Sequence, residues 1–435
     1  MRISKLAMIA MIACGMNAAN AFGDQATDIS QVSFCAAESC DCGEPVCGCE
    51  PMAPSCDSGS CDSGCDSAGC LDMGCLDMGC LGGECCLGDP WELFGSTDSG
   101  WSAGGWMQLG YHSNAIPLFN NRPDEVQLQQ AWLYAEKAID TSCGFDIGGR
   151  IDYLYGTDAQ NTQAFGIDNN HWDNGWDNGS TDNGYGHAMP QLYAEAGYGD
   201  LSVKAGHFYT IIGWEVVQAT GNFFYSHAYT MNNSEPFTHT GALATYNVND
   251  NITAYGGYVL GWDSGFEDNG DAFLGGLSVG LSDDLTVTYA SVGGVFQNNR
   301  AGGTDNYVKG YMQSIVADLA LSDNLQYIFQ TDYLTAEDRV GGTVAETFDI
   351  NQYLIYTVSD CWAFGGRFEW YNEEGIYSAV GDSADIYALT LGANYKPHAN
   401  VIVRPEIRWD WDSDEVAGLD GDSQTTFGID SIFTF

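Results

Sequence analysis

The sequence predicts an all-β protein: a transmembrane, antiparallel, up-and-down β-barrel of about sixteen strands, with a disordered, cysteine-rich N-terminal extension. Three observations predict this fold class. From Trp101 onward, segments of about ten residues alternate apolar with small or polar residues, as membrane-spanning strands do. The connections between these segments alternate between short and long, and the last segment ends in the aromatic residue Phe435. No stretch reaches the roughly 20 continuous apolar residues of a spanning helix, so a membrane location requires a closed barrel.

The N-terminus has the features of an export signal. Arg2 and Lys5 precede an apolar run, and a small-residue Ala-Asn-Ala site ends at Ala21. We therefore expect residues 1–21 to be a cleaved signal peptide. Lipidation of Cys14 is the competing interpretation, because the residues before it loosely match a lipidation site.

Most of the cysteines lie in one low-complexity tract. The chain has 16 cysteines, and 13 of them fall within residues 35–86 among Gly, Asp and Ser. Few large apolar residues accompany them, so we expect a disordered segment without a packed core. Exported cysteines usually form disulfides, and three interpretations stay open: internal cross-links, links to other envelope proteins, or a soft-metal site. Residues 22–100 are thus expected to be a periplasmic extension and linker, and residues 101–435 the outer-membrane barrel.

Sixteen segments fit the strand pattern. In the segment 401–411, Val403 and Ile407 share one face, while Arg404 and Arg408 share the other. The expected strands are 101–112, 126–139, 144–156, 188–199, 201–209, 237–248, 252–262, 272–281, 285–296, 309–321, 325–336, 348–358, 362–372, 385–395, 401–411 and 425–435.

The connections between these segments indicate how the chain is oriented. Seven of them are short and rich in turn-forming residues, such as Gly199-Asp200 and Asp283-Asp284, whereas eight are longer. Outer-membrane barrels have short periplasmic turns and longer external loops. An even number of strands then places both the N-terminus and the C-terminus in the periplasm.

The charge balance excludes one class of partner. The chain has 13 basic and 59 acidic residues, a formal net charge of −46. Nucleic acid requires a basic surface, so it is not an expected partner. Two of the basic and 15 of the acidic residues precede position 101, which leaves 11 basic and 44 acidic residues in the expected barrel. We therefore expect a channel through it to favour cations.

The connection at 210–236 has an unusual composition. It carries Trp214, Phe223 and other large apolar residues, which a water-exposed loop rarely does. Two interpretations stay open. The loop either folds into the lumen as a constriction, where Glu215 and Glu235 would face the pore, or it packs over the barrel mouth or at a contact between subunits.

Charged residues on the polar faces of the strands are the other candidates for the pore lining. They are Arg150, Lys204, Arg367, Glu369, Arg404, Glu406 and Arg408. A ladder of arginines opposite loop carboxylates would create a transverse field that orders polar solutes. Alternatively, each arginine pairs with a nearby acid, and the candidate acids are Asp152, Glu369, Glu406 and Asp410.

One acidic loop suggests a metal site. Residues 168–186 repeat Trp-Asp-Asn-Gly and offer hard oxygen ligands for Ca²⁺, although their spacing is not that of an EF-hand. A solvated acidic loop is the simpler interpretation, so we expect no obligatory cofactor. The seven histidines show no metal-ligand spacing, and the adjacent His112 and Ser113 point to opposite sides of a strand. We therefore expect that the protein is not an enzyme.

Three motifs carry a resemblance to a known family. They are GWMQLGYHSN at 105–114, QQAWLYAEK at 129–137 and KAGHFYTIIGWE at 204–215. With the aromatic terminus, they resemble the OmpL-like β-barrel porins of planctomycetes. The resemblance covers residues 101–435 and does not extend to the cysteine tract. It implies a barrel and a channel role, and it carries no catalytic residues.

The expected function is therefore that of a porin, a passive diffusion channel for small hydrophilic solutes in the bacterial outer membrane. The alternative is a structural or adhesive envelope protein, in which a plugged barrel anchors a disulfide-cross-linked extension. The expected partners are outer-membrane lipid, small hydrophilic solutes and further copies of the chain in a homotrimer.

Overall fold

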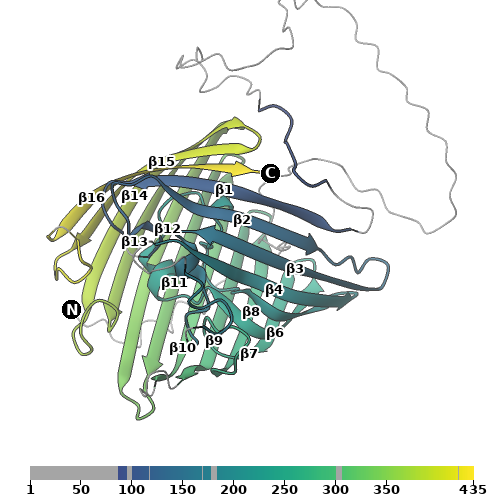
Figure 1. The fold of residues 1–435 in the computed structure, drawn as a ribbon, viewed down its shortest axis with the longest axis horizontal. Helices are drawn as coiled ribbons and strands as arrows, with labels where there is room; N and C mark the ends of the chain where they lie inside the picture. The colour runs from purple at the N-terminus through teal and green to yellow at the C-terminus, as the bar shows by residue number, and fades with distance from the viewer. Residues whose placement is uncertain are drawn as a thin grey trace, which may run out of the picture.

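The computed structural model describes residues 87–95, 100–116, 118–168, 170–177, 184–299, 306–419 and 421–435 (Figure 1). The predicted signal peptide, the lipidation alternative at Cys14 and the cysteine tract lie outside the described residues. Two cysteines belong to the described part of the chain. Cys143 is exposed and free, whereas Cys361 is disulfide-bonded.

Sixteen strands form one closed antiparallel barrel, which confirms the predicted fold class. The strands are β1 (Ser102–His112), β2 (Gln127–Lys137), β3 (Phe145–Gly156), β4 (Gly186–Tyr198), β5 (Leu201–Tyr209), β6 (Thr238–Asn249), β7 (Ile252–Val259), β8 (Asp271–Ser282), β9 (Leu285–Asn299), β10 (Asn306–Ser322), β11 (Leu325–Glu337), β12 (Thr343–Ser359), β13 (Trp362–Glu374), β14 (Ala384–His398), β15 (Val401–Asp412) and β16 (Ser423–Thr434). Each strand pairs with its neighbours in sequence, and β1 pairs with β16 to close the ring. Closure leaves no exposed strand edge, as a membrane-spanning sheet requires.

The two ends of the barrel differ in the length of their connections. At one end, six of the seven connections are two residues long, and the seventh is 138–144. We call this the short-turn end. The eight connections at the other end have five to 29 residues, and six of them exceed the longest at the first end: 113–126, 157–185, 210–237, 260–270, 300–305, 338–342, 375–383 and 413–422. We call that the long-loop end.

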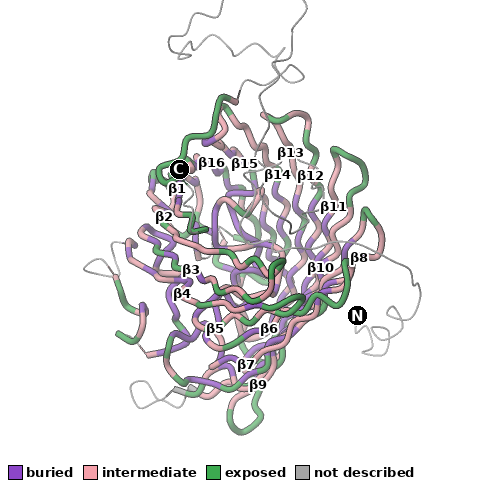
Figure 2. Tube along the Cα trace, turned by 90° about the vertical axis from the view of Figure 1, so that its right-hand side faces the viewer, coloured by how far each residue is buried: buried purple, intermediate pink, exposed green. Residues whose placement is uncertain are grey.

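The side chains of each strand alternate between an inner and an outer face. On β15, Arg404 and Arg408 face inward and are buried, while Ile407 and Trp411 face outward and are exposed. Figure 2 shows this alternation of buried and exposed positions along the strands. The outer face presents an apolar surface of the kind that lipid requires.

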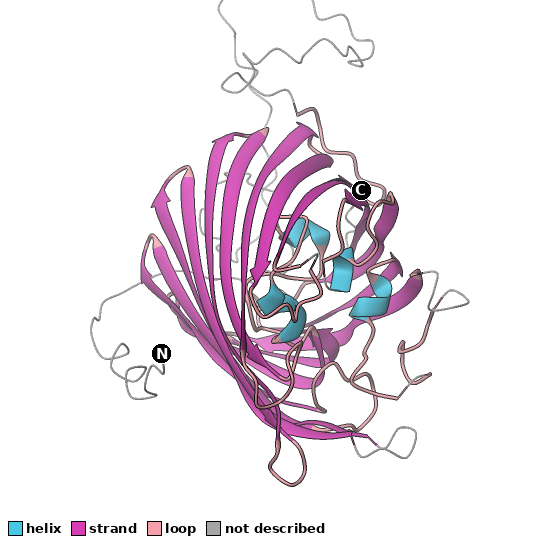
Figure 3. Cartoon of the chain, turned by 90° about the vertical axis from the view of Figure 1, so that its left-hand side faces the viewer, coloured by secondary structure: helices cyan, strands magenta, loops and turns pink. Residues whose placement is uncertain are grey.

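Four short helical turns complete the described structure. They are η2 (Leu118–Asn120), α1 (Ala159–Thr162), η4 (Ala219–Gly221) and α2 (Tyr229–Asn233). Figure 3 shows that they lie within the ring of strands. In the part of the chain that the structure describes, no helix is both long enough and apolar enough to cross a membrane.

Candidate functional site inside the barrel

The connection between β5 and β6 lies inside the barrel. We refer to residues 210–236 as the inner loop. Six of its large apolar side chains are almost fully buried, namely Ile212, Val217, Phe224, Tyr225, Tyr229 and Met231. The others are half-buried, namely Ile211, Trp214, Val216 and Phe223. The loop donates or accepts hydrogen bonds with inward-facing residues from β2 to β15. The structure therefore agrees with the first of the two interpretations from the sequence, in which the loop folds into the lumen.

One part of the inner wall is apolar and holds the inner loop by burial. Ile212 belongs to a buried cluster with inward-facing side chains of β6, β8, β9, β10 and β11, which include Leu243, Leu274, Val292, Met312 and Leu334. Further along the loop, Val217 and Met231 pack into a second cluster with Trp132 of β2. An inner wall of this kind would be exposed to water without the loop, so burial favours the folded-in position.

The opposite part of the inner wall is polar and holds the backbone of the inner loop. Glu369 of β13 accepts hydrogen bonds from the backbone N–H groups of Tyr229 and Thr230, both at 2.8 Å. These N–H groups begin α2, where they have no partner within the helix. A carboxylate at this position satisfies them and complements the positive end of the helix dipole.

Glu406 of β15 binds the preceding part of the loop in the same manner. Its carboxylate accepts hydrogen bonds from the backbone N–H groups of Tyr225 at 2.9 Å and Ser226 at 3.2 Å. Glu369 and Glu406 therefore act on the loop backbone as acceptors rather than as free charges.

Arg367 of β13 forms an ion pair between the wall and the inner loop. Its guanidinium lies 2.6 Å from Glu215 Oε1 and also donates to the backbone oxygen of Ser226 at 2.6 Å. Glu215 also accepts hydrogen bonds from the hydroxyl of Tyr353 at 3.1 Å and the N–H of Ala228 at 3.0 Å, and its Oε2 lies 3.2 Å from His227 Nδ1. Arg367 and Glu215 are both buried, so each charge depends on the other for compensation.

Two further arginines of β15 combine a wall acid with a loop carbonyl. Arg404 pairs with Asp430 of β16 and donates to the backbone oxygen of Asn222 at 2.6 Å. Arg408 pairs with Asp410 at 2.8 Å and donates to the backbone oxygen of His227 at 2.6 Å. Both predicted patterns are therefore present, since these two arginines pair with neighbouring strand acids and Arg367 pairs with a loop carboxylate.

A group of carboxylates lies beside the inner loop without a basic partner. Gln330 donates to Glu235 at 2.6 Å and to Asp332 at 3.1 Å. The backbone N–H of Asp332 in turn donates to Asp349 at 3.2 Å. All three carboxylates are buried, and among the described residues none of them has an ion pair. One oxygen of Asp332 and one of Asp349 lack any hydrogen-bond partner there.

Arg150 and Lys204 lie apart from the inner loop. Arg150 of β3 pairs with Asp152 at 2.6 Å and lies over the ring of Tyr134. Lys204 of β5 lies over the ring of Tyr193, with its Nζ 4.3 Å from the ring centre. The structure thus brings seven of the nine predicted site residues together around the inner loop and leaves these two on another part of the wall.

The acidic loop 168–186, for which calcium binding was the alternative interpretation, is described only in part, because residues 169 and 178–183 lie outside the described residues. Asp173 accepts the backbone N–H groups of Ala164 and Met189 on its two oxygens. Burial raises the pKa of Asp173 to about 6, although these two hydrogen bonds lower it. Within the described ranges, no group of three or more His, Cys, Asp or Glu residues is arranged to hold a metal ion.

Two residues that contact the site, Asp430 and Gln330, were not among the candidates from the sequence. Asp430 is paired directly with Arg404 across β15 and β16, and Gln330 neighbours Asn351 across β11 and β12. Both residues occupy inward positions that strand alternation alone would give. Their roles depend on which inner wall the loop covers, and alternation contains no information about that.

The closed sixteen-stranded barrel with a long connection folded into its lumen defines the porin class of outer-membrane proteins. Residues 100–435 match the family model described as "Putative beta-barrel porin-2, OmpL-like". The match spans more than half of the chain, and the protein belongs to this family. A search of curated proteins finds no significant match.

Solved structures show the same fold at low sequence identity. An anion-selective porin from Comamonas acidovorans aligns with a TM-score of 0.53 and 10% identity, over 77% of this chain and 99% of the other. The outer-membrane channel DcaP of Acinetobacter baumannii aligns with a TM-score of 0.51 and 10% identity, over 79% and 99%. OmpT of Vibrio cholerae, in its trimer form, aligns with a TM-score of 0.51 and 13% identity, over 77% and 99%.

Proposed function

We propose that the protein is a passive diffusion channel for small hydrophilic solutes, with no catalytic step. The observation that carries this proposal is the closed barrel whose inner loop is held against a polar inner wall. The inner loop narrows the lumen with fixed hydrogen-bonding groups, while the strands of the wall remain paired in a closed ring. Fixed polar groups at a constriction are the elements from which pore selectivity is built.

We further propose that the channel prefers cations. Each of Arg150, Arg367, Arg404 and Arg408 has an acidic partner within 2.9 Å. The excess of 44 acidic over 11 basic residues after position 100 acts in the same direction. A negative potential in the lumen would raise the local concentration of cations and lower that of anions.

We propose that the short-turn end faces the periplasm, which would place both termini there. The short turns and long loops of outer-membrane barrels support this orientation. The proposed partners are outer-membrane lipid, small hydrophilic solutes and further copies of the chain in a homotrimer. The trimeric form of one structural relative is consistent with such an assembly.

Conductance across a planar bilayer tests the proposed function. Purified full-length protein should give discrete current steps, and a salt gradient should give a reversal potential of the sign expected for cation flow. Absence of current would refute the channel, and an anion-selective potential would refute the preference.

The many hydrogen bonds that hold the inner loop favour a second candidate function. Its hydrogen bonds reach from Gln130 of β2 to Arg408 of β15, and a loop held this firmly could close the lumen. The barrel would then act as an anchor for the cysteine-rich extension in a structural or adhesive role. This candidate predicts negligible current together with high-mass species that disappear on reduction.

A further inference from the structure

The chain that leads into the barrel is docked on the outside of the wall. The backbone N–H of Ala399 donates to the backbone oxygen of Leu87 at 2.9 Å. Trp91 then pairs with Asn400, since its N–H donates to the Asn400 side chain at 2.6 Å and its carbonyl accepts from it at 2.8 Å. Ala399 and Asn400 form the β14–β15 turn, so the segment is fixed at the short-turn end.

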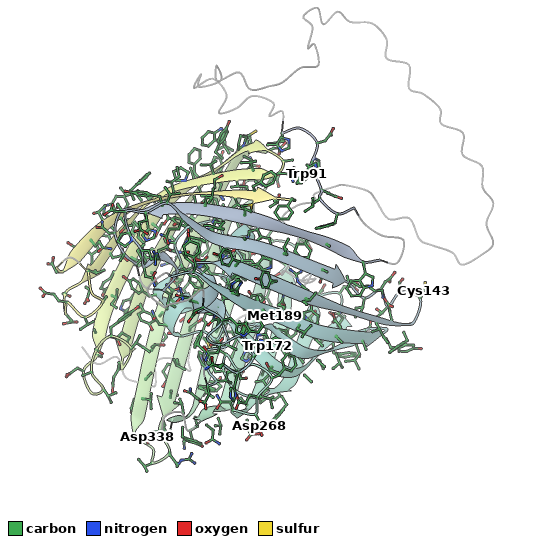
Figure 4. The ribbon with its side chains drawn as sticks, in the orientation of Figure 1. Trp91, Cys143, Trp172, Met189, Asp268 and Asp338 are labelled. Carbon is green, nitrogen blue, oxygen red and sulfur yellow. The ribbon has the colours of Figure 1, made fainter. Side chains whose placement is uncertain are left out.

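The side chain of Trp91 identifies which face of the barrel the segment follows. Its ring stacks on that of Phe433, with the ring centres 6.0 Å apart. Phe433 faces outward on β16 and is 40% exposed. Figure 4 labels Trp91 beside the barrel strands, and Figure 1 marks the C-terminus nearby in the same orientation. The segment therefore runs along the outer face of the barrel and not beneath its lumen.

The same segment exposes three large apolar side chains. Trp91 is 50% exposed, Leu93 48% and Phe94 50%. Two acidic residues accompany them. Asp89 lies two residues before Trp91, and Glu92 lies between Trp91 and Leu93. Tryptophan is enriched at membrane–water interfaces, where its amphipathic ring lies at the level of the lipid headgroups.

An aromatic belt on the barrel continues to this segment. On β13 and β14, Trp362 stacks against Tyr395 with ring centres 4.4 Å apart, and Phe364 lies beside Trp362. On β16, Phe433 lies beside Phe435. These outward rings lie close to the short-turn end, where barrels place aromatic side chains at the level of the lipid headgroups. The contact between Trp91 and Phe433 adds one more ring to this belt from outside the barrel.

We propose that Trp91, Leu93 and Phe94 form a lipid anchor that holds the N-terminal extension against the membrane surface at the short-turn end. The occupant of this apolar surface is phospholipid, at the boundary between headgroups and acyl chains. Continuity with the lipid-facing belt favours lipid over a protein partner, because the ring of Trp91 stacks on outward-facing Phe433. The proposal requires only that the barrel lies in a bilayer, so it can succeed even if the channel conducts no ions.

Fluorescence of full-length protein in liposomes tests the anchor. The difference spectrum between the wild type and Trp91→Phe isolates the emission of Trp91 from that of the other tryptophans. This emission should be quenched by phospholipid brominated near the headgroup and be shielded from aqueous iodide. The variant Leu93→Ser/Phe94→Ser should lose the bromine quenching and gain iodide quenching.

A matched control and a folding control complete the test. Val340→Ser replaces an apolar residue that is 89% exposed at the long-loop end, and it should leave Trp91 quenching unchanged. Heat-modifiable migration on a gel should show that every variant retains the barrel. Iodide access to wild-type Trp91 in liposomes would overturn the proposal. Shielding from iodide without bromine quenching would also overturn it, because a protein partner would then cover the segment.

Discussion

Replacing Glu215 by Gln removes one charge from the ion pair that joins the inner loop to the wall. The shape of the side chain is kept, but buried Arg367 loses the only carboxylate within 4 Å among the described residues. Removing one partner of a buried pair costs about 3–5 kcal/mol. We expect the lower end of this range, because the amide oxygen of Gln and the Ser226 carbonyl still accept hydrogen bonds from Arg367. The strand ladder is untouched, so the cost falls on the docking of the loop.

Hydrogen exchange measures this cost at the amides that the wall carboxylates bind. The N–H groups of Tyr225, Ala228 and Tyr229 donate to wall or loop carboxylates. A loss of about 3 kcal/mol corresponds to roughly 150-fold faster exchange through loop opening. Single-channel recordings of Glu215→Gln should also show more frequent fluctuations in current, because the loop leaves the wall more often.

A matched control removes an exposed ion pair of the same kind. Glu337 lies 3.4 Å from Lys309, and both side chains are 47% exposed. Exposed pairs contribute about 0–1 kcal/mol, so Glu337→Gln should change exchange of the inner loop by less than a few fold. Equal exchange in the two variants would refute the buried pair as the principal anchor of the loop.

Three further predictions concern single positions. Asp349→Asn removes a buried charge without a basic partner, so it should stabilise the docked loop by on the order of 1–2 kcal/mol at pH 8; faster exchange of the loop would contradict this. Met312→Ala leaves a cavity in the apolar inner wall and should lower the free energy of unfolding by about 2–5 kcal/mol in denaturant titrations; an unchanged midpoint would contradict the packing. The raised pKa of Asp173, about 6, gives stability that is fully present below pH 3.8 and is lost as the pH rises through 6. Exchange of the 164–168 amides, corrected for intrinsic rates, should therefore accelerate between pH 5 and pH 7.5, and slower exchange would show the opposite sign.

Strand positions were predictable because the alternation of side chains is local. The expected strand 201–209 coincides with β5 (Leu201–Tyr209), and 401–411 differs from β15 (Val401–Asp412) by one residue. The strands β10 (Asn306–Ser322) and β12 (Thr343–Ser359) are longer than expected. About 9–11 residues suffice to cross a bilayer, and here pairing continues beyond that length toward the long-loop end.

The apolar inner wall was not predictable in the same way. On β8, Leu274 faces inward while Phe273 and Leu277 face outward, so both faces of the strand are apolar. A period of two cannot distinguish the faces of such a strand. What makes the inward Leu274 stable is its burial in one cluster with Ile212 of the inner loop, a residue that lies far away in the sequence.

The roles of the candidate site residues were only partly visible from the sequence. The apolar composition of 210–236 identified the inner loop, and alternation placed Arg367 and Glu406 on inward faces. Sequence alone could not show that Glu369 and Glu406 bind backbone N–H groups of the loop. That role depends on the path of the loop across the lumen, which is set by many weak contacts at once.

The order in which the barrel can assemble follows from where the inner loop is held. The loop follows β5, whereas several of its polar anchors lie on β13 and β15, such as Glu406, which is 180 residues beyond Ser226. The ring closes only when Phe435, the final residue, exchanges backbone hydrogen bonds with Gly105. A chain released before its last strands would therefore have both an open sheet edge and an undocked loop. Contacts of such long sequence separation form slowly. The interior of the barrel therefore reaches its final arrangement only after the C-terminal strands are in place.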